Sequence, residues 1–168
     1  MRVMFLVITI IFVSCSAVNN SIQKNRNFTE KLMNSLFKEK GNVFYLNSTN
    51  STFSILWVYN KSKIEIYRLA NGKIFKKEEY NKSKNILYQI EEHFSKKIIY
   101  ELDSCMELDG DGFGFKIMND SNIIKEDLPI NIECFRKGKY QSVFFSEILR
   151  DISNYKMWDI KVMGESTD

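Results

Sequence analysis

The chain has 168 residues, of which 44% are hydrophobic and 27% are charged, and its formal net charge is +3. It contains one proline and no Gly/Ser-rich stretch, so nothing indicates a linker between two domains. The modest positive charge reflects an abundance of lysine along the chain and gives no reason to expect a nucleic-acid partner.

The first 17 residues resemble a signal peptide. Arg2 supplies a positive charge, Val3 to Val13 form an apolar core, and cleavage is expected after residue 16 or 17. The alternatives are an uncleaved membrane anchor and a lipoprotein modified at Cys15, but the apolar run is shorter than the roughly 20 residues of a membrane span. We therefore expect residues 18–168 to form one domain, secreted through the endoplasmic reticulum and without a membrane span.

Helical spacing follows the leader. Apolar residues recur three and four positions apart over residues 27–40, and Gly41 is a natural helix stop. From Val43 the period changes to two, and residues 53–59 predict a strand that is apolar on both faces.

A hairpin is predicted next. Ile64 to Leu69 and Lys73 to Tyr80 flank Asn71-Gly72, the dipeptide that type I′ turns favour. Residues 83–96 return to helical spacing and predict a further helix.

Strand signals resume in the last part of the chain. Residues 98–107 alternate between apolar and polar, Asp109 to Gly112 predict a turn, and residues 113–117 predict the next strand. The remaining predictions are a strand at 130–134, a turn at Lys137-Gly138, a strand at 139–145, a short helix at 146–154 and a strand at 158–162. This pattern predicts a mainly β protein, an antiparallel β-sandwich with two or three short helices.

N-x-S/T sequons are unusually frequent. Seven of the sixteen asparagines open such a sequon, whereas roughly two are expected by chance at this Ser and Thr content. We therefore expect a glycoprotein that carries much sugar on its surface. The acceptor residues are Asn19, Asn27, Asn47, Asn50, Asn60, Asn81 and Asn119.

Two cysteines remain after the leader is removed. In an oxidising compartment Cys105 and Cys134 most simply form one disulfide, although two buried free thiols are an alternative. Two cysteines and the single histidine, His93, are too few ligands for a zinc site, so no metal is expected.

No catalytic arrangement stands out. His93 lies on the predicted 83–96 helix, and the chain has neither a nucleophile elbow nor a reactive-cysteine signature. The segment from Glu107 to Gly112 resembles a calcium loop, but its twelfth position is Met118, which cannot bind calcium. We therefore expect an acidic turn and a protein that is not an enzyme and needs no cofactor.

Charge is unevenly distributed. Residues 60–84 hold eight basic residues, which predict either a glycosaminoglycan patch or lysine-guarded strand edges. The later acidic segment has no base, and its acids are candidates for binding a basic partner: Glu101, Asp103, Glu107, Asp109 and Asp111. Residues 98–168 contain one sequon, at Asn119, so we expect a partner to dock on this half.

The cysteine segments resemble a known family. Asp103-Ser104-Cys105, the strand ending Lys116 to Asp120, and the later run Glu133 to Tyr140 are similar to stretches of the poxviral immune-evasion β-sandwich proteins. That family includes secreted chemokine binders and endoplasmic-reticulum proteins that retain class I molecules or regulate apoptosis. This chain departs from the family pattern because it lacks the extra cysteines, the long intervening segment and a C-terminal retention tetrapeptide.

These observations lead to one expectation and two alternatives. We expect a secreted, non-enzymatic glycoprotein that binds a host or partner protein; the resemblance implies immune evasion by sequestering a chemokine-like or class I-like ligand. The alternatives are a lipocalin-like small-molecule carrier, suggested by the abundant aromatic residues, and a small MHC class I-like decoy.

Overall fold

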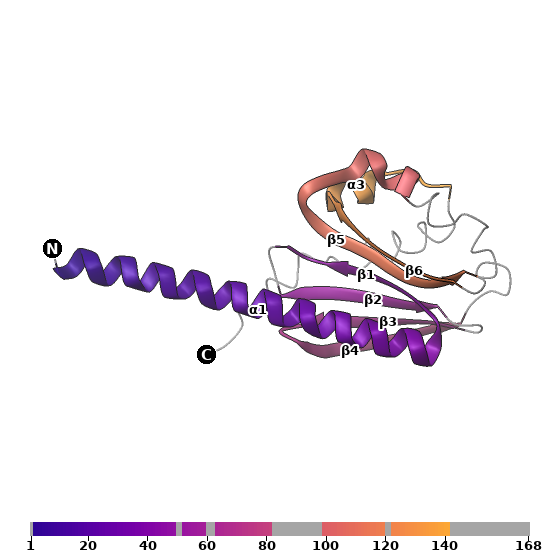
Figure 1. The fold of residues 1–168 in the computed structure, drawn as a ribbon, viewed down its shortest axis with the longest axis horizontal. Coiled ribbons are helices and arrows are strands. Elements are labelled where there is room, and N and C mark those ends of the chain that lie inside the picture. The colour runs from indigo at the N-terminus through magenta and orange to yellow at the C-terminus, as the bar shows by residue number, and fades with distance from the viewer. Residues whose placement is uncertain (1, 50–51, 60–62, 82–98, 120–121, 142–168) are drawn as a thin grey trace.

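The computed structural model describes these residues of the chain (Figure 1): 2–49, 52–59, 63–81, 99–119 and 122–141. Within them the protein is mainly β, and six strands form one antiparallel sheet in the order β4-β3-β2-β1-β5-β6. The elements are α1 (Arg2–Lys40), β1 (Asn42–Asn47), β2 (Phe53–Tyr59), β3 (Lys63–Ala70), β4 (Lys73–Asn81), η1 (Asp103–Cys105), β5 (Met106–Asn119), β6 (Asn122–Ile130) and α3 (Ile132–Lys137).

Helix α1 joins the leader and the predicted 27–40 helix into a single helix of 39 residues. Figure 1 shows its N-terminal half extending away from the sheet. Its second half packs on the sheet through Met33, Leu36 and Phe37, which are buried. The helix ends at Lys40 because Gly41 has a φ of 122°, which glycine adopts without strain. The predicted stop is confirmed.

The first four strands form a meander. Strand β2 has the predicted bounds, and all of its residues are buried. The β3–β4 hairpin turns at Asn71 and Gly72, whose φ values of 53° and 71° are both positive, as a type I′ turn requires. The Asn71 amide also donates to the Thr52 carbonyl at 3.1 Å, which ties the turn to the start of β2. The predicted hairpin is therefore confirmed.

Both faces of the sheet carry buried side chains. Neighbouring residues of a strand point to opposite sides, and β2 is buried at every position, so it contributes to a core on each face. Tyr45, Leu56 and Val58 lie in the core beneath α1. A larger core on the opposite face contains many aromatic side chains, and the segments around η1 and α3 supply three further buried residues to it: Leu102, Ile132 and Phe135.

A buried polar junction fixes α1 to the β3–β4 turn. Asn25 Nδ2 donates to Ser54 Oγ at 2.8 Å, and Asn25 Oδ1 accepts from the Gly72 amide at 2.9 Å. The hydroxyl of Thr29 donates to the Asn25 backbone carbonyl at 2.8 Å. Because these polar groups are satisfied by one another, the junction fixes the position of α1 without unpaired donors or acceptors.

Strand β5 has large side chains on one face and glycine on the other. Phe113 and Phe115 enter the larger core, whereas Gly112 and Gly114 face α1. Tyr45 pairs with Gly114 across the strands, and a Cβ added at Gly114 would lie 2.4 Å from the tyrosine ring. Gly114 therefore makes room for Tyr45.

An ion network lies near the C-terminal end of α1. Glu65 is 2% exposed and accepts hydrogen bonds from Lys40 Nζ at 2.5 Å and from the Tyr67 hydroxyl. Lys77 Nζ stands 3.3 Å from the same carboxylate. Burial alone would raise the pKa of Glu65, but these partners outweigh it and lower that pKa to about 2.

Two local predictions are wrong. Residues 99–102 are helical and lead into η1, so the strand expected over 98–107 starts only at Met106. Leu102 and Cys105, three residues apart, are both buried, which is helical spacing. The strand expected at 130–134 gives way to α3 because the Asn131 side chain accepts from the Cys134 amide and caps a helix.

Strand β6 was not predicted, because it is an edge strand whose residues are mostly exposed and lack a clear apolar alternation. The described strands all belong to one sheet, so the second sheet of a sandwich is not among them. The elements predicted at 83–96, 146–154 and 158–162 lie outside the described residues, as does most of the one at 139–145.

The two glycines of β5 provide a matched test. Replacing Gly114 with Ala should destabilise the fold by about 1–3 kcal/mol, because the methyl group displaces Tyr45 and meets the Glu126 carbonyl. At Gly112 the nearest atom to an added Cβ is 3.4 Å away, so Gly112→Ala should be nearly neutral. Urea unfolding of the two variants measures the difference, and equal midpoints would contradict this account of Tyr45.

Glu65 should make stability depend on acid pH. Its pKa is about 2 in the folded protein and 4.5 in the reference state, so its contribution is complete above about pH 5 and is lost as the pH falls toward 2. The shift corresponds to about 3 kcal/mol. Glu65→Gln should therefore destabilise the protein at neutral pH and flatten its stability between pH 5 and 2.

The exposed Glu79 is the control for this measurement, because it pairs with Lys63 and Lys77 at the surface of β4. Glu79→Gln should cost much less stability, since solvent screens these pairs. Chemical unfolding at a series of pH values separates the two variants. Parallel pH profiles for Glu65→Gln and the native protein would show that Glu65 is not the titrating group.

Candidate functional site

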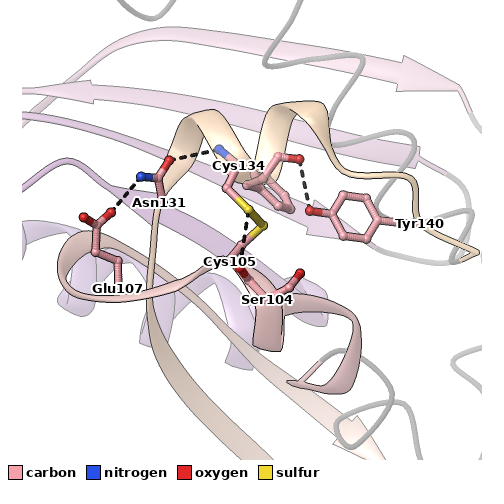
Figure 2. The surroundings of a disulfide bond; sticks show 7 residues. Ser104, Cys105, Glu107, Asn131, Cys134 and Tyr140 are labelled. Atoms are coloured by element: carbon pink, nitrogen blue, oxygen red, sulfur yellow. Dashed lines mark hydrogen bonds between the residues drawn. A yellow bond between two sulfur atoms is a disulfide. The ribbon is translucent and has the colours of Figure 1, made fainter.

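A disulfide organises the region that the acidic segment belongs to. Cys105 at the end of η1 is bonded to Cys134 in α3, with 5.4 Å between their Cα atoms, so the predicted pair is confirmed. Figure 2 shows Asn131 between the Cys134 amide, from which its Oδ1 accepts at 2.9 Å, and the carboxylate of Glu107, to which its Nδ2 donates at 2.8 Å. The disulfide and these hydrogen bonds join η1, the start of β5 and α3.

Aromatic packing holds the same region on the sheet. Phe135 is fully buried, and its ring centroid lies 5.5 Å from that of Phe113. Tyr140 packs on Phe135 and donates its hydroxyl to the Phe135 carbonyl at 3.1 Å. Burial, and secondarily the nearby charge of Glu101, raise the pKa of Tyr140 to about 12, so this hydroxyl stays protonated and remains a donor.

The segment from Tyr100 to Asp109, which we call the acidic ridge, presents apolar and acidic side chains together. Tyr100 is 84% exposed, Leu108 is 97% exposed, and Met106 is also exposed. The exposed carboxylates of Asp103, Glu107 and Asp109 lie between and beside them along the ridge. Exposed large apolar residues next to charged ones are typical of protein-binding surfaces.

The tip of the ridge is a bulge in the β5–β6 hairpin. Met106 and Asp111 both pair with Ile130, so residues 107–110 are extra residues that project from the ladder. A Cβ at Gly110 would lie 2.4 Å from the Ile130 carbonyl, so the backbone of the bulge can approach β6 only with glycine there. The turn predicted at residues 109–112 is therefore wrong: β5 runs continuously through them, and Asp111 and Gly112 are paired in the ladder.

The five acids chosen from the sequence do not have equivalent surroundings. Asp103, Glu107 and Asp109 are exposed, whereas Glu101 is half-buried. Asp111 is buried and accepts from the Thr49 amide at 2.8 Å and from its hydroxyl at 3.2 Å. Asp111 therefore fixes the end of β1, and its carboxylate is engaged inside the protein.

A polar cleft of about 670 Å³ lies between α1, the end of β1 and the β5–β6 hairpin, and residues 108–110 of the bulge line it. Its walls carry two basic side chains, Arg26 and Lys125, and three acids, Glu30, Asp109 and Asp127. Gly112, which lies opposite Asn47, leaves room in the cleft because it has no side chain there. Charges of both signs make it unlike an apolar carrier pocket.

Hydrogen bonds order part of this cleft. Lys125 Nζ donates to Glu30 at 2.9 Å and so connects β6 to α1, and this contact lowers the pKa of Glu30. Tyr45 donates to Asp127, and its pKa is raised, chiefly by burial and then by that carboxylate. By contrast, two buried polar atoms of the cleft, Arg26 Nε and Asn47 Oδ1, have no hydrogen-bond partner among the described residues.

Strand register places the sequons at both ends of the sheet. Asn47 pairs with Ser54 at one end, whereas Asn81 and Asn119 terminate their strands at the other. Asn19 and Asn27 are exposed on α1, and Asn50 and Asn60 lie outside the described residues. Thr49 of the Asn47 sequon is bonded to Asp111, so a sugar on Asn47 would stand beside the bulge.

The basic stretch is largely neutralised within the sheet. Lys63 and Lys77 pair with Glu65 and Glu79. Buried Arg68 donates to Glu78 at 2.9 Å. Lys73, Lys76 and Lys77 lie exposed on β4, which is an edge of the sheet formed by the described strands, and lysines are placed there as on a guarded strand edge.

The described residues contain no group of three or more His, Cys, Asp or Glu that could hold a metal ion. His93 lies outside them. Within the same ranges, no helix is both long and apolar enough to cross a membrane. No protein-family model, no curated protein and no solved structure matches this chain.

The cleft was not predicted from the sequence, although one pattern in the sequence indicates it. The run Gly110 to Phe115 has glycine at every second position, 110, 112 and 114, which marks a strand without side chains on one face. Its position opposite Tyr45 and Asn47 depends on the β1–β5 register, which no local pattern specifies.

The disulfide can be tested with single and double variants. Cys105→Ser should reduce secretion because the free Cys134 thiol can mispair, and the lost constraint should cost on the order of 3 kcal/mol. A variant with both cysteines replaced by Ser has no free thiol to mispair, so it should be secreted better than Cys105→Ser. It still lacks the constraint of the disulfide, so it should melt at a lower temperature than the native protein. Non-reducing peptide mapping should find the linked pair. Unchanged melting of the double variant would contradict a stabilising role for the bond.

Proposed function

We propose that this chain is a secreted, non-enzymatic glycoprotein that binds a partner protein through the acidic ridge. The observation that carries the proposal is the exposure of Tyr100 and Met106 next to the carboxylates of Asp103 and Glu107. An interface built this way combines apolar anchors with charges that select a basic partner.

Rigidity supports this choice of surface. The disulfide at Cys105 lies in the middle of the ridge, and Glu107 is held by Asn131. A surface that is already fixed loses little conformational entropy when a partner binds. The exposed side chains of the ridge are thus presented on an ordered backbone.

The positions of the sequons favour residues 100–107 as the docking surface over the acids at positions 109 and 111. If Asn47 carries sugar, Asp111 and Asp109 lie beside it, whereas Tyr100 and Asp103 lie on the other side of the disulfide in the chain. A partner therefore docks around residues 100–107, and the expected contact of Asp111 with a partner becomes indirect. This refines the set of five acids that the sequence indicated.

The class of partner rests on the family resemblance. A chemokine-like ligand is basic and suits an acidic ridge, and a class I-like ligand is the second class that the family binds. Membership of that β-sandwich family, and with it a role in immune evasion, is part of this proposal.

The cleft favours one alternative function, a small-molecule carrier. Its volume of about 670 Å³ falls in the range of ligand sites. However, the cleft is polar and lies outside the apolar cores, and in the described sheet β4 and β6 are separate edges. A lipocalin-type barrel would join its edge strands and enclose an apolar cavity, so protein binding is preferred. Native mass spectrometry of secreted material tests for a retained ligand.

The ridge is tested by binding kinetics against a panel of purified chemokines, with class I molecules as a second panel. Tyr100→Ala should weaken the affinity by about 10-fold or more, mainly through faster dissociation. Asp103→Lys should slow association several-fold and reduce its dependence on salt.

Glu39→Lys is the matched control, because it reverses one exposed charge on α1, away from the ridge. It should leave association unchanged if the effect of Asp103 is local. Binding that is insensitive to both ridge variants would show that the partner contacts another surface. Absence of saturable binding to either panel would reject these partner classes.

A further inference from the structure

We propose that the polar cleft holds the first sugar of an N-glycan attached to Asn47, so that this glycan is an internal part of the fold. The inference rests on the glycosylation in the proposed function but not on partner binding. It assigns an occupant to a cleft that shares only Leu108 and Asp109 with the acidic ridge.

Asn47 is placed at the cleft by strand register. Val43, Tyr45 and Asn47 alternate along β1 and therefore face α1, and Asn47 lines the cleft with Tyr45. Its cross-strand neighbour on β5 is Gly112, where an added Cβ would lie 3.7 Å from Asn47 Cβ. A glycine at this position leaves space for a group attached to the asparagine side chain.

The unpaired polar atoms point to an occupant with both donors and acceptors. Arg26 Nε is a buried donor and Asn47 Oδ1 is a buried acceptor, and neither has a partner in the described part of the chain. An unsatisfied buried polar group costs about 1–3 kcal/mol. Both atoms are closed to solvent, so an occupant relieves this cost when the Arg26 or Asn47 side chain turns its polar atom into the cleft. A sugar hydroxyl or acetamido group offers both kinds of hydrogen bond.

The charges of the cleft favour a neutral occupant. Three acids face two bases, and two of these acids are already engaged, Glu30 by Lys125 and Asp127 by Tyr45. An anion would be repelled by the excess of carboxylates, and the cleft lacks an exclusively acidic lining for a cation. N-acetylglucosamine is neutral and polar, and Leu108 and Pro129 supply exposed apolar surface for it in the cleft.

Two sequons border this cleft, and they serve as test and control. Asn27 also lines it, but Asn27 is exposed on α1, whereas Asn47 is partly buried on β1. A glycan on Asn27 therefore has open solvent to extend into. The threonines of both sequons must be left intact, because Thr29 and Thr49 make internal hydrogen bonds.

The experiment compares Asn47→Gln and Asn27→Gln in protein secreted from a cell line that adds oligomannose glycans, with occupancy mapped by mass spectrometry. Asn47→Gln should lower the melting temperature by several degrees, whereas Asn27→Gln should not change it. Trimming the native glycans to a single N-acetylglucosamine should preserve the melting temperature. Release of the Asn47 glycan from native protein by a glycoamidase should be slower than release of the Asn27 glycan.

Arg26→Met links the effect to the cleft. It should destabilise the protein that carries sugar on Asn47 and have little effect in the Asn47→Gln background, because the hydrogen bond to the sugar is then already absent. An unoccupied Asn47 alongside occupied sequons elsewhere, or equal melting of Asn47→Gln and Asn27→Gln, would overturn the assignment.

Free chitobiose, added to Asn47→Gln protein, distinguishes the source of the sugar. No rise in melting temperature is expected, since the attached sugar benefits from a high effective concentration that the free one lacks. A saturable rise would identify the cleft as a receptor for external carbohydrate instead. Failure of the chemokine and class I panels would leave all these outcomes unaffected, so the two proposals fail independently.

Discussion

The burial of strand β2 on both sides is the constraint on which the rest of the fold depends. Ile55 and Trp57 enter the larger core, while Leu56 and Val58 face α1, so neither face of the sheet can be left to solvent. The second half of helix α1 covers one face and is held there by the Asn25 junction and, at its C-terminal end, by the Glu65 network. The segment closed by the disulfide covers part of the other face through Phe135.

This arrangement explains why the acidic ridge and the cleft are neighbours. The α1 core lies over β1, β2 and β3, so the helix leaves the β5–β6 hairpin partly uncovered on its side. That uncovered surface has glycines and charged residues where the rest of the sheet has apolar ones. The same hairpin bulges at residues 107–110, which form one wall of the cleft and the tip of the ridge.

The sequence correctly predicted the elements whose formation depends on a few neighbouring residues. The Asn71-Gly72 turn, the Gly41 helix stop, strand β2 and the disulfide pair were all predictable, because turn chemistry, capping, periodicity and cysteine pairing each act over few residues. The helical residues before Cys105 and the α3 helix were misassigned as strands, since a short apolar alternation also fits one helical turn. There the packing of Leu102 and Phe135 on the sheet decides the outcome.

The candidate site depended on contacts between distant segments. Sequence alone indicated an acidic segment, but it could not separate the exposed Asp103 from the buried Asp111, whose partner Thr49 is 62 residues away. The cleft needed the register that sets Asn47 opposite Gly112. Both depend on the β1–β5 pairing, which joins two parts of the chain that no local motif connects.

The internal hydrogen bonds of two sequon threonines have a consequence for the order of events during biosynthesis. A transferase that modifies Asn27 or Asn47 must reach the hydroxyl of Thr29 or Thr49, and in the folded protein Thr29 is buried and Thr49 is bound to Asp111. Sugar addition at these sites must therefore precede the docking of α1 and the pairing of β1 with β5. The fraction of chains modified at each site then depends on the rate of sugar transfer relative to the rate of folding. A slower-folding variant would therefore carry more sugar than the native protein.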